Sequence, residues 1–429
     1  MKYKILVRGP ALSQTGYGEQ CRFALRALRS REDLFDIYLL NIPWGGTNWI
    51  FDDSEERRWI DELIIKAKPM LDEQNQNPQV SLFDVSLQVT IPNELHRIAQ
   101  KNVLYTAGIE TDRACEEWIA KCHQFADKIL VISEHAKAGL QTPIKVHDQN
   151  GNEIEFVLQK PIEVVHYPVK KVEVKNLDLQ LDTDFNFLAM AQWGPRKNLP
   201  NMITWFCEEF HDNEDVGLVV KTFAKGNSRI DRAFINSTIK QISNNFPDKK
   251  CKVYLLHGYM TEEEIHSLYV DPKIKVMINF GHGEGFGLPL FEAAYSGLPI
   301  ITHDFGGQKD FLYAPKKNKK GESKLRAHFS KINYDLEPVQ KEVLWQGVIE
   351  PNMSWAYPKE SNCKIAMREA VKNYGLLQGE AKRLKKWIEK EFTQQAKYDD
   401  FLEKSGFLES GLEKKEIDDL FSDLFDDDE

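Results

Sequence analysis

The amino-acid sequence predicts an α/β protein with two domains. The chain has 429 residues, which is too long for one ordinary hydrophobic core and suits two domains of about 150 to 200 residues each. Strand-like and helix-like segments alternate along it, as in parallel sheets covered by helices. This alternation occurs in two successive halves of similar length. We therefore expect two Rossmann-like domains that face each other across a cleft.

The boundary between these domains is predicted near residue 172. Residues 1–172 are expected to form the first domain and residues 173–384 the second. Residues 385–405 are then expected to return to the first domain as a helix, and residues 406–429 form an acidic tail.

The first half begins with a strand-like run over residues 4–8. A glycine-containing loop over residues 9–18 follows, and then a helical pattern over residues 19–30. Ser133 is placed to cap a helix that starts at Glu134. The other predicted strands of this half are 35–40, 85–91, 102–106, 128–132 and 161–168, with a polar hairpin around residues 148–152.

The second half repeats the pattern after a polar linker over residues 177–185. Residues 316–326 are expected to form a basic loop, and residues 380–404 a long charged helix. The predicted strands of this half are 187–191, 217–221, 252–256, 275–280 and 299–302.

The composition narrows the class of function. The net charge of −10 is poorly suited to non-specific binding of nucleic acid. Six scattered cysteines show no metal-ligand spacing, so no metal site is predicted. The first residues lack a signal-peptide pattern, and no stretch of about 18 apolar residues occurs. We expect a cytoplasmic protein without a membrane span.

The densest chemistry lies in residues 281–292, GHGEGFGLPLFE. A strand-like run over residues 276–280 precedes it, Pro289 suits the first turn of a helix, and Gly297 suits the left-handed stop of one. We therefore predict a helix over residues 288–296, fed by a glycine-rich loop at the carboxyl end of a strand. Open α/β sheets bind their ligands at this position.

This helix start suits a diphosphate, because it presents free N–H groups and a partial positive charge. Glu284 is placed to accept hydrogen bonds from sugar hydroxyls, and Glu292 to hold both hydroxyls of a ribose. Both are expected to be ionised at pH 7. A tight structural turn with surface glutamates is the alternative. The backbone that would approach the ligand belongs to Gly285, Phe286, Gly287 and Leu288.

Residues 283–302, GEGFGLPLFEAAYSGLPIIT, resemble the signature of retaining glycosyltransferases with the GT-B fold, of the family 4 type. The resemblance covers most of the chain. It implies sugar transfer from a nucleoside diphosphate donor, linked to uridine or guanosine, with retention of anomeric configuration. It implies no obligatory metal and no cofactor other than this donor, which is a substrate. It does not indicate the acceptor.

Residues 187–198 resemble the first strand and loop of the donor domain in this family. The resemblance implies that Arg196 and Lys197 hold the diphosphate, where two cations stabilise the leaving group. Relatives often carry Gly-Arg where this chain has Gln192 and Trp193. Arg196 or Lys221 is then the candidate to substitute for the missing cation.

Two further segments resemble parts of the donor domain. Residues 252–268 resemble the strand, turn and helix before the signature, and within them Tyr259 either borders the nucleobase or only packs. Residues 304–312, DFGGQKDFL, contain Gly306 and Gly307, which resemble a loop that closes over the donor; a simple turn is the alternative.

In the first half, Gly16 lies in a loop predicted to face the sugar or the acceptor. Residues 108–112, GIETD, resemble a variant of a loop in which other family members carry a histidine that contacts the donor sugar. By position, Glu110 is therefore a candidate catalytic residue, together with Glu284, Arg196 and Lys197. Thr111 and Asp112 have an alternative role as caps of the helix that contains Trp118.

The acceptor is left open. Residues 44–49, WGGTNW, form either an aromatic loop on the acceptor side or partly buried packing. The compact acidic chain also resembles phage-encoded enzymes that glycosylate modified bases of DNA, which would place it in the host cytoplasm. The basic run at residues 316–326 is the feature that points to DNA, and a solvated insertion is its alternative. A third hypothesis is a non-catalytic nucleotide-sugar-binding protein; Glu284, Glu292, Arg196 and Lys197 occurring together argue against it.

Overall fold

The computed structural model describes residues 2–77, 79–147, 152–317 and 321–408. The chain divides into two compact units. Unit 1 comprises Met1–Gly108, Ala114–Pro168 and Gln394–Glu429, and unit 2 comprises Ile109–Arg113 and Val169–Thr393. Apart from the short segment 109–113, the chain passes into unit 2 after residue 168, where the boundary is predicted near residue 172, and it returns to unit 1 at residue 394, where residue 385 is predicted. The acidic tail beyond residue 408 lies outside the described residues.

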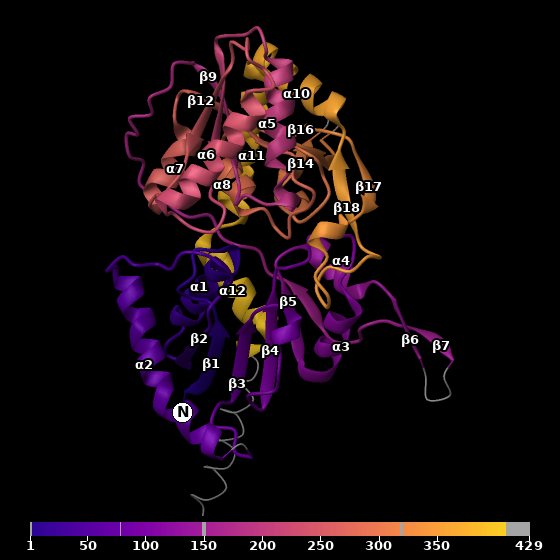
Figure 1. The fold of residues 1–429 in the computed structure, drawn as a ribbon. Helices are drawn as coiled ribbons and strands as arrows, with labels where there is room; N and C mark the ends of the chain where they lie inside the picture. The colour runs from indigo at the N-terminus through magenta and orange to yellow at the C-terminus, as the bar shows by residue number, and fades with distance from the viewer. Residues whose placement is uncertain (1, 78, 148–151, 318–320, 409–429) are drawn as a thin grey trace, which may run out of the picture. The chain divides into compact units, whose positions relative to one another are not determined.

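Unit 1 is a parallel six-stranded sheet with helices packed on it (Figure 1). The strands lie in the order β2-β1-β3-β4-β5-β8, so the direction of progression reverses between β1 and β3. The strands are β1 (Tyr3–Gly9), β2 (Phe35–Asn41), β3 (Val85–Val89), β4 (Lys101–Thr106), β5 (Lys128–Val131) and β8 (Ile162–Val164). The helices are α1 (Gly16–Arg29), α2 (Glu55–Gln76), η1 (Pro92–Glu94), α3 (Glu116–Phe125), α4 (Glu134–Gln141) and α12 (Gln394–Ser405).

Unit 2 contains a second parallel six-stranded sheet, ordered β11-β10-β9-β12-β13-β16. Its strands are β9 (Phe185–Met190), β10 (Val216–Lys221), β11 (Lys252–Leu256), β12 (Ile274–Asn279), β13 (Ile300–Thr302) and β16 (Ser330–Lys331). Its helices are η2 (Pro195–Lys197), α5 (Leu199–Glu209), α6 (Arg229–Ser243), α7 (Glu262–Val270), α8 (Leu288–Ser296), α9 (Lys309–Leu312), η3 (Lys341–Val343), α10 (Glu360–Lys372) and α11 (Tyr374–Glu391). Each unit is thus a Rossmann-like α/β domain, which confirms the predicted fold class.

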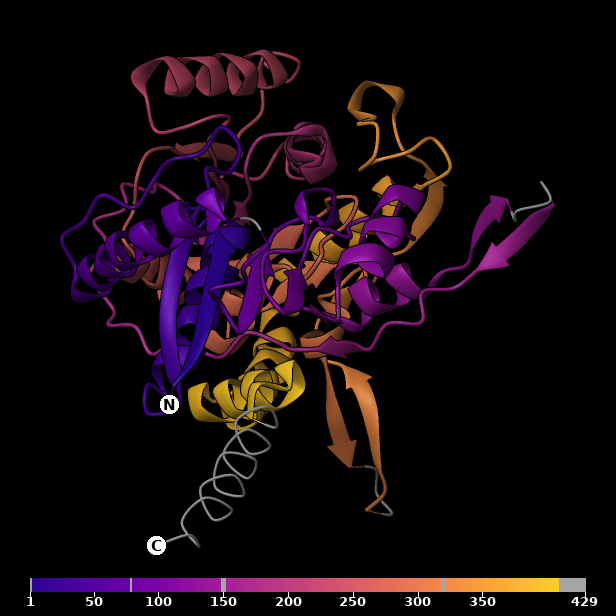
Figure 2. The ribbon, with the colours of Figure 1, turned by 90° about the horizontal axis from the view of Figure 1, so that it is seen from below.

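In the described part of the chain, three antiparallel strand pairs form small sheets of their own, separate from the two large ones. One joins β6 (Ile144–His147) to β7 (Glu153–Phe156) in unit 1, where a hairpin is predicted; residues 148–151 of its turn lie outside the described part. In unit 2, β17 (Tyr334–Pro338) pairs with β18 (Ser354–Pro358). There too, β14 (Tyr313–Lys317) pairs with β15 (Ser323–Ala327) and projects from its unit (Figure 2). The prediction of a basic loop over residues 316–326 is therefore wrong for its described part, because strand pairing orders the backbone.

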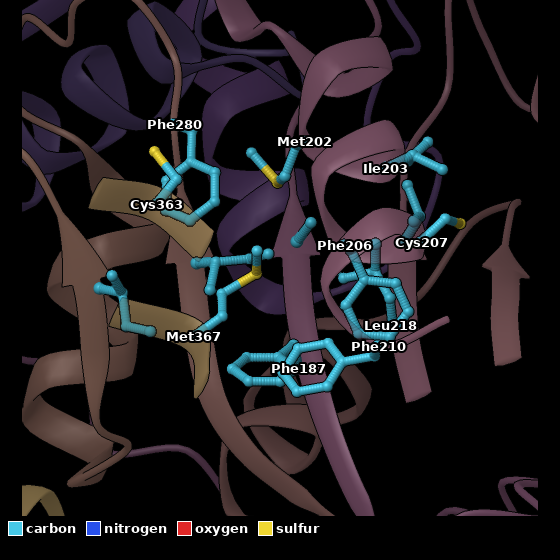
Figure 3. Packing of buried hydrophobic residues seen from close by; sticks show 14 of the residues in the cluster. Phe187, Met202, Ile203, Phe206, Cys207, Phe210, Leu218, Phe280, Cys363 and Met367 are labelled. Carbon is cyan, nitrogen blue, oxygen red and sulfur yellow. The ribbon is translucent and has the colours of Figure 1, made fainter. Parts of the chain in front are cut away.

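The hydrophobic core of unit 2 holds helix α5, which follows β9 and η2 in the chain. Phe187 of β9 is completely buried, with its ring centroid 6.0 Å from that of Phe206 and 5.6 Å from that of Phe210. Figure 3 shows these rings together, with Met367 of α10 beside them. Burying each such side chain contributes about 1.5–3 kcal/mol. This packing anchors α5, and η2 directly precedes α5 in the chain.

Three predictions about helices are corrected. Residues 380–404 do not form one helix, because α11 ends at Glu391 and α12 begins at Gln394. Gly16 is not in a loop: it begins α1, whose first turn is capped by the side chain of Thr15. No element is predicted above for residues 55–76, where α2 lies; the cap Ser54 followed by Glu55 and Glu56 is the local signal for it.

Helix α12 packs on α1 within unit 1, where the ring of Phe401 lies 5.7 Å from that of Phe23. Within unit 2, the N–H of Val169 donates to the carbonyl of Phe392 (2.8 Å), close to residue 169, where the chain enters this unit, and residue 393, where it leaves. No helix in the described part of the chain is long and apolar enough to cross a membrane.

Candidate active site

Two loops of unit 2 leave adjacent strands on either side of the point where the strand order reverses. From β9 the chain moves outward to β10 and β11, and then returns to β12 on the other side of β9. The loop after β9 carries Arg196 and Lys197, and the loop after β12 carries Glu284. Ligands of open α/β sheets bind at the carboxyl ends of strands at such a reversal. The fold therefore brings these two sequence motifs to one ligand-binding edge.

Asn279 at the end of β12 holds the loop that follows. Its side-chain carbonyl accepts a hydrogen bond from the N–H of Gly281 (2.9 Å), and its amide donates to Oε1 of Glu284 (3.0 Å). His303 fixes the same loop, because its Nε2 donates to the carbonyl of Gly281 (2.5 Å). Its Nδ1 accepts from the N–H of Phe305 (3.1 Å), which requires a neutral ring, and burial lowers the pKa of His303 to about 4.

Helix α8 spans Leu288–Ser296, as predicted. Gly287 before it has φ of 90° and Gly297 after it has φ of 83°, both in the left-handed region that favours glycine. Pro289 lies in its first turn, and no side chain of the described residues caps that turn. The amino end of α8 therefore presents backbone N–H groups and a partial positive charge toward the glycine-rich loop.

The four predicted catalytic side chains form one ionic cluster in unit 2. The ammonium group of Lys197 lies 2.6 Å and 2.7 Å from the two carboxylate oxygens of Glu284. Arg196 donates from Nη1 to the carbonyl of Gly283 (2.7 Å), and its Nη2 lies 2.9 Å from Oε1 of Glu110. Arg196 also lies 3.5 Å from Oε2 of Glu284. The cluster therefore contains two cations and two carboxylates.

Burial and charge act in opposite directions on these groups. Burial alone would raise the pKa of Glu284, but Lys197 and Arg196 outweigh it and lower this pKa to about 2. Burial lowers the pKa of Lys197, assisted by the neighbouring charge of Arg196. Burial also raises the pKa of Glu110, against the opposing effect of Arg196 and Lys197. The side chain of Glu284 is 9% exposed, so solvent screens its ion pairs weakly.

Glu110 reaches the cluster because residues 109–113 belong to unit 2. Asp112 pairs with the start of β18: its N–H donates to the carbonyl of Ser354 (3.1 Å), and its carboxylate accepts from the N–H of Ser354 (2.6 Å). Helix α3 begins at Glu116 after Cys115, without a side-chain cap. The alternative that Thr111 and Asp112 cap this helix is therefore wrong.

The backbone of Gly283 touches that of Glu110. A Cβ atom on Gly283 would lie 1.9 Å from the carbonyl oxygen of Glu110, so only glycine fits there. On the other side of the loop, the N–H of Gly307 donates to the carbonyl of Glu284 (2.8 Å). The segment with Gly306 and Gly307 thus packs directly on the glycine-rich loop.

Glu292 lies one turn into α8, and the hydroxyl of Tyr269 from α7 donates to its Oε2 (2.8 Å). Lys221, at the carboxyl end of β10, is 7% exposed and donates to the carbonyl of Gly258 (2.5 Å). Burial lowers the pKa of Lys221 to about 8. Tyr259 is 39% exposed beside Gly258. These residues therefore line the same carboxyl edge of the sheet as the ionic cluster.

The loop residues Gly285, Phe286 and Gly287 lie between Glu284 and the start of α8 at Leu288, as predicted. Gly16 belongs to unit 1 and is not part of the cluster. Asn279, His303 and Tyr269 are residues of this site that were not identified from the sequence. A polar residue that ends a buried strand just before a glycine-rich loop is the signal that identifies Asn279; for Tyr269 the sequence contains none.

Within the described residues, no group of three or more His, Cys, Asp or Glu side chains is arranged to hold a metal ion.

Residues 237–319 match the model of a protein family described as Glycosyl transferases group 1. This segment includes Glu284, α8 and Glu292. No curated protein sequence matches the chain.

Solved structures show the same fold. Sucrose-phosphate synthase from Thermosynechococcus elongatus is 12% identical, with 97% of this chain and 99% of that chain covered and a TM-score of 0.60. HepE from Anabaena, solved with UDP and glucose, is 12% identical, with 94% and 98% covered and a TM-score of 0.59. The chain spans 55% of the length of TarM from S. aureus, which is 13% identical over 75% of this chain at a TM-score of 0.47.

The fold and the matched segment together show which class of proteins this chain is similar to. The chain has the two-domain GT-B fold of glycosyltransferases, and the segment matched by the group 1 family carries half of the ionic cluster's acidic groups. The chain is thus similar to group 1 glycosyltransferases at its candidate active site.

We expect Gly283→Ala to disrupt this site. The added methyl group would overlap the carbonyl of Glu110, so residues 109–113 must shift and Arg196 must lose one carboxylate partner. The expected result is a lower melting temperature and weaker nucleotide binding, measured by thermal unfolding and calorimetric titration. Gly194→Ala is the matched control in the neighbouring loop, because a Cβ there meets no atom within 4 Å. Equal effects of the two substitutions would contradict the contact.

The pKa of Glu284 predicts a pH dependence of stability. Its pKa is lowered on folding from about 4.5 to about 2, so the ionised form favours the folded state. This contribution is complete above pH 4.5 and is lost as the pH falls toward 2. The difference in melting temperature between the wild type and Glu284→Gln should therefore shrink as the pH falls from 4.5 toward 2.

The control for this measurement is Glu389→Gln, whose side chain is 48% exposed and 3.7 Å from Lys385. Such a surface pair contributes little, so the two melting temperatures should stay close at every pH. A difference between wild type and Glu284→Gln that does not change between pH 5 and pH 2.5 would show that Glu284 is not held ionised by the cluster.

Proposed function

We propose that this chain is a retaining glycosyltransferase that transfers a sugar from a nucleoside diphosphate to an acceptor. The observation that carries the proposal is the bidentate pairing of Lys197 with Glu284 beside the uncapped amino end of α8. The match to group 1 glycosyltransferases over residues 237–319 supports it. So does the fold shared with HepE, which was solved with UDP and glucose.

The diphosphate is assigned to the amino end of α8 and to Lys197. An ammonium group has three N–H donors, and Glu284 accepts two of them. The third is directed to a phosphate oxygen, so Lys197 links the leaving group to the residue that holds the sugar. The guanidinium of Arg196 stays on Gly283 and Glu110, and holds the loop in shape.

Lys221 is the second cation proposed for the diphosphate. The cluster of Arg196, Lys197, Glu110 and Glu284 is neutral as a whole, so a bound diphosphate needs a further positive charge. Lys221 ends the strand next to β9, and its lowered pKa of about 8 leaves it ready to become fully charged beside an anion. It thus takes the place of the arginine that relatives often carry near Trp193.

Glu284 is assigned to the transferred sugar, and Glu292 to the ribose. A carboxylate with a pKa of about 2 stays ionised at neutral pH, so Glu284 accepts hydrogen bonds from sugar hydroxyls and donates no proton. The hydroxyl of Tyr269 orients the carboxylate of Glu292 for the ribose hydroxyls. The backbone N–H groups of Phe286 and Gly287 contribute to binding the donor.

In the proposed reaction the bond between the sugar and the leaving phosphate breaks, and the acceptor oxygen bonds to the same face of the sugar. The leaving diphosphate takes the acceptor's proton. The protein supplies positioning and stabilises the negative charge that develops on the diphosphate. A glycosyltransferase of this kind needs cations and oriented N–H groups more than a strong base, and the cluster contains these groups.

The direct test is a panel of UDP- and GDP-linked sugars, with release of the nucleoside diphosphate measured with and without acceptors. We expect release with at least one donor. Lys197→Ala should slow it about 100-fold, because the leaving group loses a cation. Glu292→Gln should raise KM about tenfold, because the ribose loses a charged hydrogen-bond partner. The control is Lys240→Ala on α6, an exposed lysine.

Tight binding of a nucleotide sugar without any release would favour the alternative of a non-catalytic binding protein. The anomeric configuration of the product, read by proton NMR, tests retention, and an inverted product would contradict it. Transfer to modified DNA stays a hypothesis from the sequence. Of its basic run, Lys316 is paired with Glu380 at 3.0 Å.

A further inference from the structure

A loop of unit 1 exposes large aromatic side chains to solvent. We call residues 44–51, which follow β2, the aromatic loop. Trp49 is 48% exposed and Phe51 is 67% exposed, while Trp44 is half-buried against Tyr17 with ring centroids 4.4 Å apart. Aromatic surface left in water costs free energy, so a cluster of it on a folded domain indicates a binding surface.

Hydrogen bonds hold this loop in place, so its exposure does not reflect a lack of structure. The N–H of Gln14 donates to the carbonyl of Asn48 (2.9 Å), and the N–H of Ile50 donates to the carbonyl of Leu12 (2.8 Å). These bonds form an antiparallel bridge between Ser13 and Trp49. The aromatic loop is therefore bonded to a second loop, residues 10–15, which connects β1 to α1.

The second loop is itself fixed by a buried arginine. Arg22 of α1 is 7% exposed and donates to the carbonyls of Ala11 (2.7 Å) and Ser13 (2.9 Å). This loop leaves the carboxyl end of β1, next to the reversal of strand order between β1 and β3. Parallel sheets bind ligands at such reversals. Position in the fold and exposure of aromatic rings thus point independently to a ligand on the aromatic loop.

The charges around the loop indicate which ligand fits. Residues 44–58 contain the carboxylates of Asp52, Asp53, Glu55 and Glu56 and the guanidinium groups of Arg57 and Arg58. Both guanidinium groups are in ion pairs, Arg57 with Asp61 (3.1 Å) and Arg58 with Asp53 (3.1 Å). Glu55 and Glu56 pair in turn with Arg29 (3.3 Å) and Arg26 (2.7 Å) of α1. Cations that carboxylates already neutralise attract a phosphate backbone only weakly. A neutral ring is accepted, because the negative face of an aromatic ring attracts the C–H groups of a ligand stacked on it.

We propose that the aromatic loop is the acceptor-binding surface, and that the acceptor is a neutral saccharide whose ring stacks on Trp49. The inference rests on the proposed glycosyltransferase function, and it adds the chemical class of the acceptor and the residues that hold it. The hydroxyls of Ser13 and Thr47 lie 3.1 Å apart, and that of Thr47 donates to the carbonyl of Trp44 (3.0 Å), so they hold the base of the loop in place.

The test uses the full-length protein and a panel of neutral saccharides: methyl α- and β-glucoside, methyl α- and β-galactoside, maltose and cellobiose. Saturation-transfer NMR reports whether ring protons touch the protein. We expect signals from at least one saccharide, and an affinity reduced about tenfold in Trp49→Ala. Trp49→Phe keeps an aromatic face and should retain most of the binding. Phe234→Ala, which removes a 54% exposed ring on α6, is the control and should bind as the wild type does.

Three results would overturn this inference: no saccharide signal, a signal unchanged in Trp49→Ala, or sugar transfer to an oligonucleotide instead of the saccharides. Release of nucleoside diphosphate by the wild type is measured in parallel. If release occurs but Trp49→Ala leaves saccharide binding unchanged, the proposed function stands and the acceptor assignment fails. If no donor is bound or cleaved while saccharide binding still depends on Trp49, the proposed function fails instead.

Discussion

The pairing of Lys197 with Glu284 is the interaction on which the candidate site depends. It joins two loops that lie 87 residues apart in the chain and leave neighbouring strands at the reversal of the sheet. Each partner is costly to bury alone, so each fixes the other. The packing of Phe187 with Phe206 holds one side in place, and Asn279 with His303 holds the other. The result is a charged site that is preorganised before any ligand binds.

This arrangement has a functional consequence. Lys197 keeps Glu284 ionised, so in the proposed reaction the group assigned to the sugar and the group assigned to the leaving diphosphate depend on a single ion pair. The segment with Glu110 extends the network through Arg196, whose Nη2 lies 2.9 Å from the carboxylate of Glu110. Burial raises the pKa of Glu110, so its protonation at low pH removes the charge on one partner of Arg196.

The sequence predicted well what local chemistry determines. The bounds of α8 follow from Pro289 and Gly297, and the positions of most strands follow from short apolar runs. It failed where contacts between residues far apart in the chain determine where a helix ends or which unit a segment joins. Packing of Phe401 on Phe23 separates α12 from α11, and pairing with Ser354 draws residues 109–113 into unit 2. Lys197 and Glu284, both chosen from the sequence, lie together in the structure, whereas their roles stay predictions. Tyr269 was not identified, because its partner Glu292 is brought to it only by the packing of α7 near α8.

The central claim is that Lys197, Glu284 and the amino end of α8 form the donor site. The most direct measurement is a crystal structure of the chain with a bound nucleoside diphosphate, UDP or GDP. We expect the diphosphate to lie within hydrogen-bond distance of Nζ of Lys197 and of the first N–H groups of α8, with the ribose on Glu292. A nucleotide bound elsewhere, with the pair of Lys197 and Glu284 untouched by ligand, would contradict it.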